Sequence, residues 1–135
     1  MIILTDRASF RPQDFDPIAA ADQLRLVDAG QELLPGVEPI FTDGHTVGLM
    51  HPLVHGAGEA LFYCADLIPM AAHLKLPYVM GYDLHPLTTM TEKKRILQRA
   101  VEGNWGLVFE HDPVMAGARI AFDKRGNAQI SEPLF

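Results

Sequence analysis

The chain has 135 residues, of which 48% are hydrophobic and 21% charged; this composition is typical of a folded domain and excludes a disordered or collagen-like polypeptide. Eleven basic and seventeen acidic side chains give a formal net charge of −6, so we expect no nucleic-acid-binding and no membrane-binding surface. With one cysteine, no secretory signal pattern and no apolar run of membrane-spanning length, residues 1–135 are expected to form a single cytoplasmic domain.

The N-terminal part is expected to begin with a strand end and a loop over residues 1–16. A helix should follow over residues 17–24, with Pro17 at its first position. The Asp16 carboxylate is the expected N-cap, because it accepts hydrogen bonds from the free N–H groups of a first helical turn. The alternating pattern of residues 24–28 then predicts a short strand.

Three apolar runs in the middle of the chain predict strands over residues 37–42, 47–54 and 60–65. The Gly-rich segment 55–59 between the second and the third run is short enough to join them as a hairpin. Cys64 lies within the third run and is expected to be a small buried hydrophobic residue.

A helix is predicted over residues 91–102, because its apolar residues recur on one face. Thr89 and Glu92 have the spacing of a capping box at its start, and Gly103 is the expected left-handed C-terminal cap. The opposite face is expected to be solvated, and it carries the basic and amide side chains Lys93, Lys94, Arg95, Gln98 and Arg99.

Short strands over residues 106–110, 119–122 and 128–130 complete the expected elements. Antiparallel hairpins with interspersed helices predict a mixed α/β domain.

Three of the predicted strands end in polar residues that suit a metal ion. The strand over 37–42 runs into Asp-Gly-His-Thr at 43–46, the strand over 60–65 into Asp66, and the strand over 106–110 into His111 and Asp112. Neutral imidazole and carboxylate groups are ligands that Zn²⁺ accepts, and a strand end holds such a ligand rigidly. Each of these ends also has an ordinary explanation as a turn or a solvated loop, so it is their combination that predicts a metal site.

The same segments carry a resemblance to a known family. Residues 43–48, Asp-Gly-His-Thr-Val-Gly, resemble the Gly-His-Thr-Pro-Gly-His loop of the metallo-β-lactamase superfamily. Residues 64–67 resemble its Gly-Asp motif, and residues 110–113 resemble the strand-end histidine near its C-terminus. The intervening segments look like lactonase-like and esterase-like members over most of the chain. The resemblance implies an α/β fold that is the C-terminal half of a metallo-β-lactamase αβ/βα sandwich.

In that superfamily a carboxylate bridges two metal ions, and histidines complete the coordination. The resemblance therefore implies that Asp66 is the bridging, catalytic carboxylate, that His111 is a histidine ligand, and that zinc or another divalent metal is the cofactor. Leu49 stands where the second histidine of the Gly-His-Thr-Pro-Gly-His loop is expected. The third ligand is then His45, which we favour, or His51, or it is absent.

The segment after the Gly-Asp motif borders the substrate cleft in the superfamily. His73 and Tyr82 of this segment are therefore candidate substrate-side residues, with a loop histidine and a packed tyrosine as the alternative interpretation.

The His-x-His-x-Asp-His signature, which supplies most ligands in the superfamily, does not occur in the sequence. One interpretation is an incomplete, C-terminal part of a metal-dependent hydrolase. It would act on an ester, lactone or related bond of a small-molecule substrate, with the missing ligands on another segment or polypeptide. The alternative is a non-catalytic, truncated or degenerate relic without metal, paired as a homodimer that covers its apolar sheet face. An unrelated binding module is a third interpretation.

Overall fold

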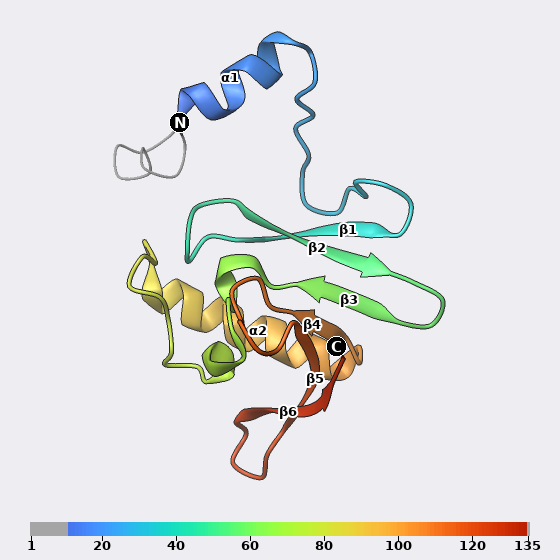
Figure 1. Cartoon of the computed structure of the whole chain (residues 1–135), viewed down its shortest axis with the longest axis vertical. Coiled ribbons are helices and arrows are strands. Elements are labelled where there is room, and N and C mark those ends of the chain that lie inside the picture. Colours follow the sequence, from blue (N-terminus) through green and yellow to red (C-terminus); the bar gives the residue numbers. More distant parts are fainter. Residues whose placement is uncertain (1–10, 135) are drawn as a thin grey trace.

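Residues 11–134 are described by a computed structural model of the chain, and their strands form one mixed sheet (Figure 1). The strands follow one another across the sheet in chain order. Neighbouring strands are antiparallel except β3 and β4, which are parallel. The strands are β1 (Val37–Thr42), β2 (Leu49–His55), β3 (Ala60–Tyr63), β4 (Gly106–Val108), β5 (Gly117–Phe122) and β6 (Ala128–Pro133).

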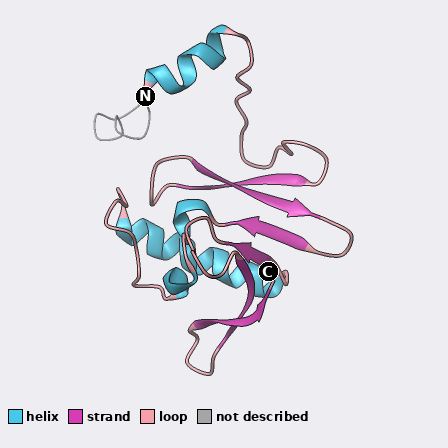
Figure 2. Ribbon diagram, viewed as in Figure 1, coloured by secondary structure: helices cyan, strands magenta, loops and turns pink. Residues whose placement is uncertain are grey.

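The parallel pair requires a crossover, and the helical segment between β3 and β4 provides it. This segment contains the 3-10 helices η2 (Ala65–Leu67) and η3 (Ala71–Leu74) and the helix α2 (Pro86–Glu102). The helix α2 lies along the sheet (Figure 2). Its buried residues Ile96, Leu97 and Ala100 belong to the same hydrophobic cluster as Phe62 and Leu107 of the sheet, so α2 and the sheet share one core.

The strands are largely where the sequence predicts them. β1 has the expected bounds, and β2 and β3 form the expected hairpin. β3 and β4 each end two residues before the predicted boundary. Cys64 is fully buried, as expected.

The N-terminal predictions are wrong in detail. The helix α1 spans Pro12–Ala20 rather than 17–24, so Pro12 is at its first turn and Asp16 is inside it rather than at its N-cap. Proline suits the first turn because the N–H that it lacks would have no helical partner there. Residues 24–28 form no strand, since a strand needs a neighbour to pair with. The prediction for residues 1–10 lies outside the described residues.

The start of α2 also differs from the prediction, because the helix begins at Pro86 and not at Thr91. Thr89 is buried inside the helix, and Glu92 bonds to a distant loop, so the two do not form a capping box. At the other end Gly103 has a φ of −88°, and Asn104 takes the left-handed conformation with a φ of 51°.

The prediction of a solvated basic face is wrong for Lys93. Its side chain is fully buried, and its ammonium group donates hydrogen bonds to the carbonyl oxygens of Lys75 (2.9 Å) and Tyr78 (2.6 Å). Burial lowers the pKa of Lys93 to about 8, against an opposing effect of the negative charge on Asp83. The segment between η3 and α2 therefore folds over this lysine.

On the face of the sheet away from the α2 core, the β1–β2 part is apolar and partly open to solvent. The register pairs Val37 with Val54 and Phe41 with Met50 on this face. Val54 and Met50 are 43% and 40% exposed. No helix among residues 11–134 is both long enough and apolar enough to cross a membrane.

Candidate metal centre

The strand directions bring the predicted site residues to one edge of the sheet. β1 and β3 are both antiparallel to β2, and β4 is parallel to β3, so these three strands point the same way. Their carboxyl ends therefore meet at one edge. His45 follows β1, Asp66 lies in η2 just after β3, and His111 follows β4.

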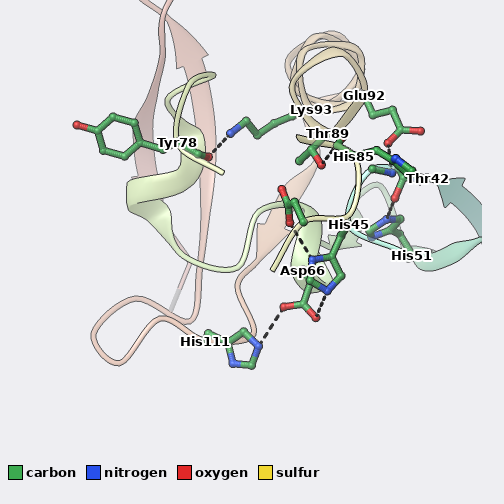
Figure 3. Close-up of polar contacts among 12 residues, drawn as sticks. Thr42, His45, His51, Asp66, Tyr78, His85, Thr89, Glu92, Lys93 and His111 are labelled. Carbon is green, nitrogen blue, oxygen red and sulfur yellow. Dashed lines mark hydrogen bonds and ion pairs between the residues drawn. The ribbon is translucent and has the colours of Figure 1, made fainter. Parts of the chain in front are cut away.

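The Asp66 carboxylate lies between the two histidines (Figure 3). Its Oδ2 is 3.4 Å from the His45 Nε2, and its Oδ1 is 3.2 Å from the His111 Nε2. The group whose ligand atoms all lie within 4.8 Å of one another consists of Asp66, Glu110 and His111, and His45 is not part of it. The structure thus brings both predicted histidine ligands close to Asp66, each beside a different oxygen of its carboxylate.

A sharp turn delivers Asp66 to this position. Ala65, the residue before it, has a φ of 42°, in the left-handed region that residues other than glycine rarely adopt. Ala65 stands where the Gly-Asp motif, which residues 64–67 resemble, has its glycine. The chain therefore keeps a glycine-like backbone conformation there at a cost in strain.

His45 is held in one orientation by a second carboxylate. Its Nδ1 lies 2.8 Å from the Oδ1 of Asp83, whose side chain is only 1% exposed. A carboxylate accepts hydrogen bonds and donates none, so the Nδ1 must carry the proton. In the neutral imidazole the lone pair is then on Nε2, the atom that faces Asp66.

The loop that carries His45 is clamped by α2 and by the segment before it (Figure 3). The Glu92 carboxylate accepts hydrogen bonds from the backbone N–H groups of Asp43 (2.9 Å) and Gly44 (3.0 Å). The backbone N–H of His85 donates to the Gly44 carbonyl at 2.8 Å. These contacts join residues more than 40 positions apart in sequence and fix the loop against the helix.

The loop that carries His111 is anchored in a similar way. The backbone N–H of His111 donates to the carbonyl of Pro69 at 2.9 Å. The carboxylate of Asp112 accepts hydrogen bonds from the backbone N–H groups of Ala71, Val114 and Met115, and these bonds lower the pKa of Asp112. The His111 ring itself is 53% exposed, so it remains accessible to a ligand.

His51, the alternative ligand, is engaged elsewhere. It is fully buried in β2, its Nε2 lies 2.7 Å from the Thr42 hydroxyl, and its ring stacks on Phe62. Burial lowers the pKa of His51 to about 4. The structure therefore places His51 in the core between strands, and His45 is the histidine of this region that faces Asp66.

The two expected substrate-side residues differ in exposure. Tyr82 is 83% exposed. His73 is half-buried in η3, its Nδ1 is buried without a hydrogen-bond partner among the described residues, and burial lowers its pKa.

Sequence reasoning missed three residues of the site. Glu110 is next to His111 and was detectable as a neighbouring carboxylate at the same strand end. Asp83 and Glu92 act on residues 38 to 49 positions away, and no local pattern marks them.

The donor types fit a divalent metal ion, because zinc accepts carboxylate oxygen and neutral imidazole nitrogen. In a tetrahedral site with metal–nitrogen bonds of about 2.0–2.1 Å, neighbouring ligand atoms are about 3.3 Å apart. The separations of 3.4 and 3.2 Å on either side of the Asp66 carboxylate agree with that value. The two contacts use different oxygens of Asp66, and His45 is not in the group of ligand atoms that all lie within 4.8 Å of one another. A two-metal site needs more ligands than these.

The fold of the described chain is that of part of a metallo-β-lactamase domain, as solved structures show. The hydrolase AbOPH of the beta lactamase superfamily superimposes with a TM-score of 0.78 and 17% identity, over 92% of this chain and 43% of that chain. AidC, a dizinc quorum-quenching lactonase, gives a TM-score of 0.70 and 20% identity over 97% of this chain and 47% of its own. A probable metal-dependent hydrolase from Staphylococcus aureus gives 0.69 and 23%, over 85% of this chain and 42% of its own.

These likenesses confirm the expected mixed α/β, metallo-β-lactamase fold. The chain spans less than half the length of each of these three proteins. Comparisons of the sequence with protein-family models and with curated proteins find no match.

Proposed function

We propose that the chain binds a divalent metal ion of the zinc type through His45, Asp66 and His111. We further propose that it is the C-terminal part of a metal-dependent hydrolase acting on an ester, lactone or related bond of a small-molecule substrate. The observation that carries the proposal is the Asp66 carboxylate between two imidazole nitrogens at 3.2 and 3.4 Å. The Nε2 lone pair of neutral His45 would repel this carboxylate, so a cation beside both groups would stabilise the contact.

The chemistry that such an ion supplies when bound is a water of lowered pKa and polarisation of the substrate oxygen. The residues of this chain hold and orient the site. Asp66 contributes both carboxylate oxygens, and His45 presents its Nε2 from a loop clamped by Glu92. The exposed Tyr82 and the partly buried His73 are the side chains that we place on the substrate side.

The proposal includes a partner surface, because these ligands alone do not complete a two-metal centre. The apolar β1–β2 part of the sheet face away from α2, with Met50 and Val54 exposed, is where a further polypeptide segment with the remaining ligands would pack. The same face supports the alternative function, a non-catalytic relic that pairs as a homodimer. The two differ in whether metal is bound.

The decisive experiment is a zinc titration of the purified, metal-stripped chain by isothermal calorimetry. We expect one equivalent of zinc to bind, and the affinity to fall at least about tenfold in His45→Ala, Asp66→Ala and His111→Ala. His55→Ala is the matched control, because His55 lies at the opposite end of β2 beside Glu38. A wild-type chain that binds no stoichiometric zinc overturns the proposal.

Two further measurements separate the alternatives. Hydrolysis of a nitrophenyl ester or a lactone by the zinc-loaded chain supports catalysis by this chain alone. A dimer in size-exclusion chromatography together with no zinc binding supports the relic.

A further inference from the structure

Asp83 lies behind His45 as a buried carboxylate with one side-chain partner. Its side chain is 1% exposed, and its Oδ1 accepts a hydrogen bond from the His45 Nδ1 at 2.8 Å. The other oxygen, Oδ2, is buried without a hydrogen-bond partner among the described residues. Burying a carboxylate is costly unless it is hydrogen-bonded, so the hydrogen bond to His45 is the side-chain interaction that stabilises Asp83 here.

The backbone keeps Asp83 and His45 in fixed register. The residue after Asp83, Leu84, donates its backbone N–H to the His45 carbonyl at 3.1 Å. His85 donates in the same way to the Gly44 carbonyl at 2.8 Å. The two segments are therefore joined by the main chain as well as by the side chains, and the imidazole has little freedom to turn away.

A buried cation accompanies the buried carboxylate. The Lys93 ammonium group is fixed by the carbonyls of Lys75 and Tyr78, and the charge of Asp83 favours its protonated form. Lys93 thus adds a positive charge to the buried region of Asp83, whose side-chain hydrogen bond is directed at His45.

We propose that Asp83 is a positioning residue of the metal centre. It fixes His45 in the tautomer with the proton on Nδ1, so that the lone pair on Nε2 is directed at the space beside Asp66. A carboxylate that accepts the second N–H of a ligand histidine sets both the tautomer and the ring orientation. The effect on metal affinity rests on the proposed function, whereas the tautomer is a property of the metal-free chain.

The first readout is the tautomer of His45 in metal-free protein labelled with ¹⁵N-histidine. Two-bond proton–nitrogen correlation spectra distinguish protonated from unprotonated ring nitrogens, and His45→Gln assigns the signal. We expect the Nδ1–H form in the wild type and a shift toward the Nε2–H form in Asp83→Ala. Asp83→Leu has a branched side chain of similar shape without a hydrogen-bond acceptor and is the second variant if Asp83→Ala does not fold.

The second readout is zinc affinity by competition with a chromogenic chelator. We expect Asp83→Ala to weaken zinc binding by about 10–100-fold. Asp123→Asn is the matched control, because the carboxylate of Asp123 bonds only within the β5–β6 turn, and neither readout should change there.

The outcomes separate the two proposals. An unchanged His45 tautomer in the Asp83 variants, or zinc affinity within about threefold of the wild type, overturns the role of Asp83 while the metal site stands. A wild-type chain that binds no zinc overturns the proposed function, and the tautomer still decides whether Asp83 orients His45.

Discussion

Gly44 is the position where a single methyl group tests how tightly the His45 loop packs on α2. A Cβ added at Gly44 would lie 2.5 Å from the Cα of Thr89 and closer still to the backbone nitrogen and the hydroxyl oxygen of that residue. Two of these three atoms belong to the backbone, so a rotamer change of Thr89 cannot remove the clash. The φ of Gly44 is not in the left-handed region, so the steric contact with Thr89 alone decides how the substitution changes stability.

The expected cost follows from two opposing effects. Overpacking at a tight contact costs about 1–3 kcal/mol. Replacing glycine by alanine also restricts the unfolded chain, which stabilises the fold by about 0.4–1 kcal/mol. We therefore expect Gly44→Ala to lower the free energy of unfolding by about 1–2 kcal/mol. Because His45 is the next residue, we also expect zinc affinity to fall about tenfold as the Nε2 is displaced from Asp66.

The assay is urea unfolding followed by circular dichroism, with the free energy extrapolated to zero denaturant. Gly81→Ala is the matched control, since a Cβ there meets no atom within 4 Å and its φ is also outside the left-handed region; we expect it to be neutral or slightly stabilising. The double variant Gly44→Ala/Thr89→Ala should not recover wild-type stability, because the backbone contacts remain. Equal stability of the Gly44 and Gly81 variants would refute the reasoning.

Three other predictions concern buried or strained groups. Folding lowers the pKa of Lys93 from 10.5 to about 8, so the unfolded chain binds more protons than the folded chain between these pH values. The free energy of unfolding, measured with urea, should therefore rise by a few kcal/mol from pH 8 to 10.5. Lys93→Met should abolish this rise. The pKa of His51 is lowered from 6.5 to about 4, so the free energy of unfolding should fall by on the order of 3 kcal/mol as the pH drops through this range. The fall should be smaller in His51→Gln. Equal pH dependence of stability in the variant and the wild type would contradict this. Ala65→Gly should raise the thermal midpoint, with a gain of about 0.5–1 kcal/mol, because glycine relieves the left-handed φ of 42°; an unchanged or lower midpoint would argue against strain at this turn.

Local patterns predicted the strands well because a strand depends on the alternation of side chains along a short run. β1 has the predicted bounds, and the Gly-rich loop between β2 and β3 was sufficient to predict the hairpin. The resemblance of the strand-end segments to the metallo-β-lactamase superfamily also predicted the fold that the solved structures confirm.

Local patterns failed where a distant contact competed with them. Thr89 and Glu92 have the spacing of a capping box, but the Glu92 carboxylate bonds to the loop at Asp43 and Gly44 instead. Pro86 then starts the helix one turn earlier. Lys93 lies on the face that looked solvated, and it is buried because the segment with Lys75 and Tyr78 folds over it.

The sequence by itself determined which chemical groups stand at the strand ends, namely His45, Asp66 and His111, because residue type and strand position are both local properties. Only the tertiary structure decided that these groups meet, since that depends on three strands running in the same direction within one sheet. It also decided which nitrogen of His45 faces Asp66. That choice depends on Asp83, which lies 38 residues further along the chain and within hydrogen-bond distance only in the folded state.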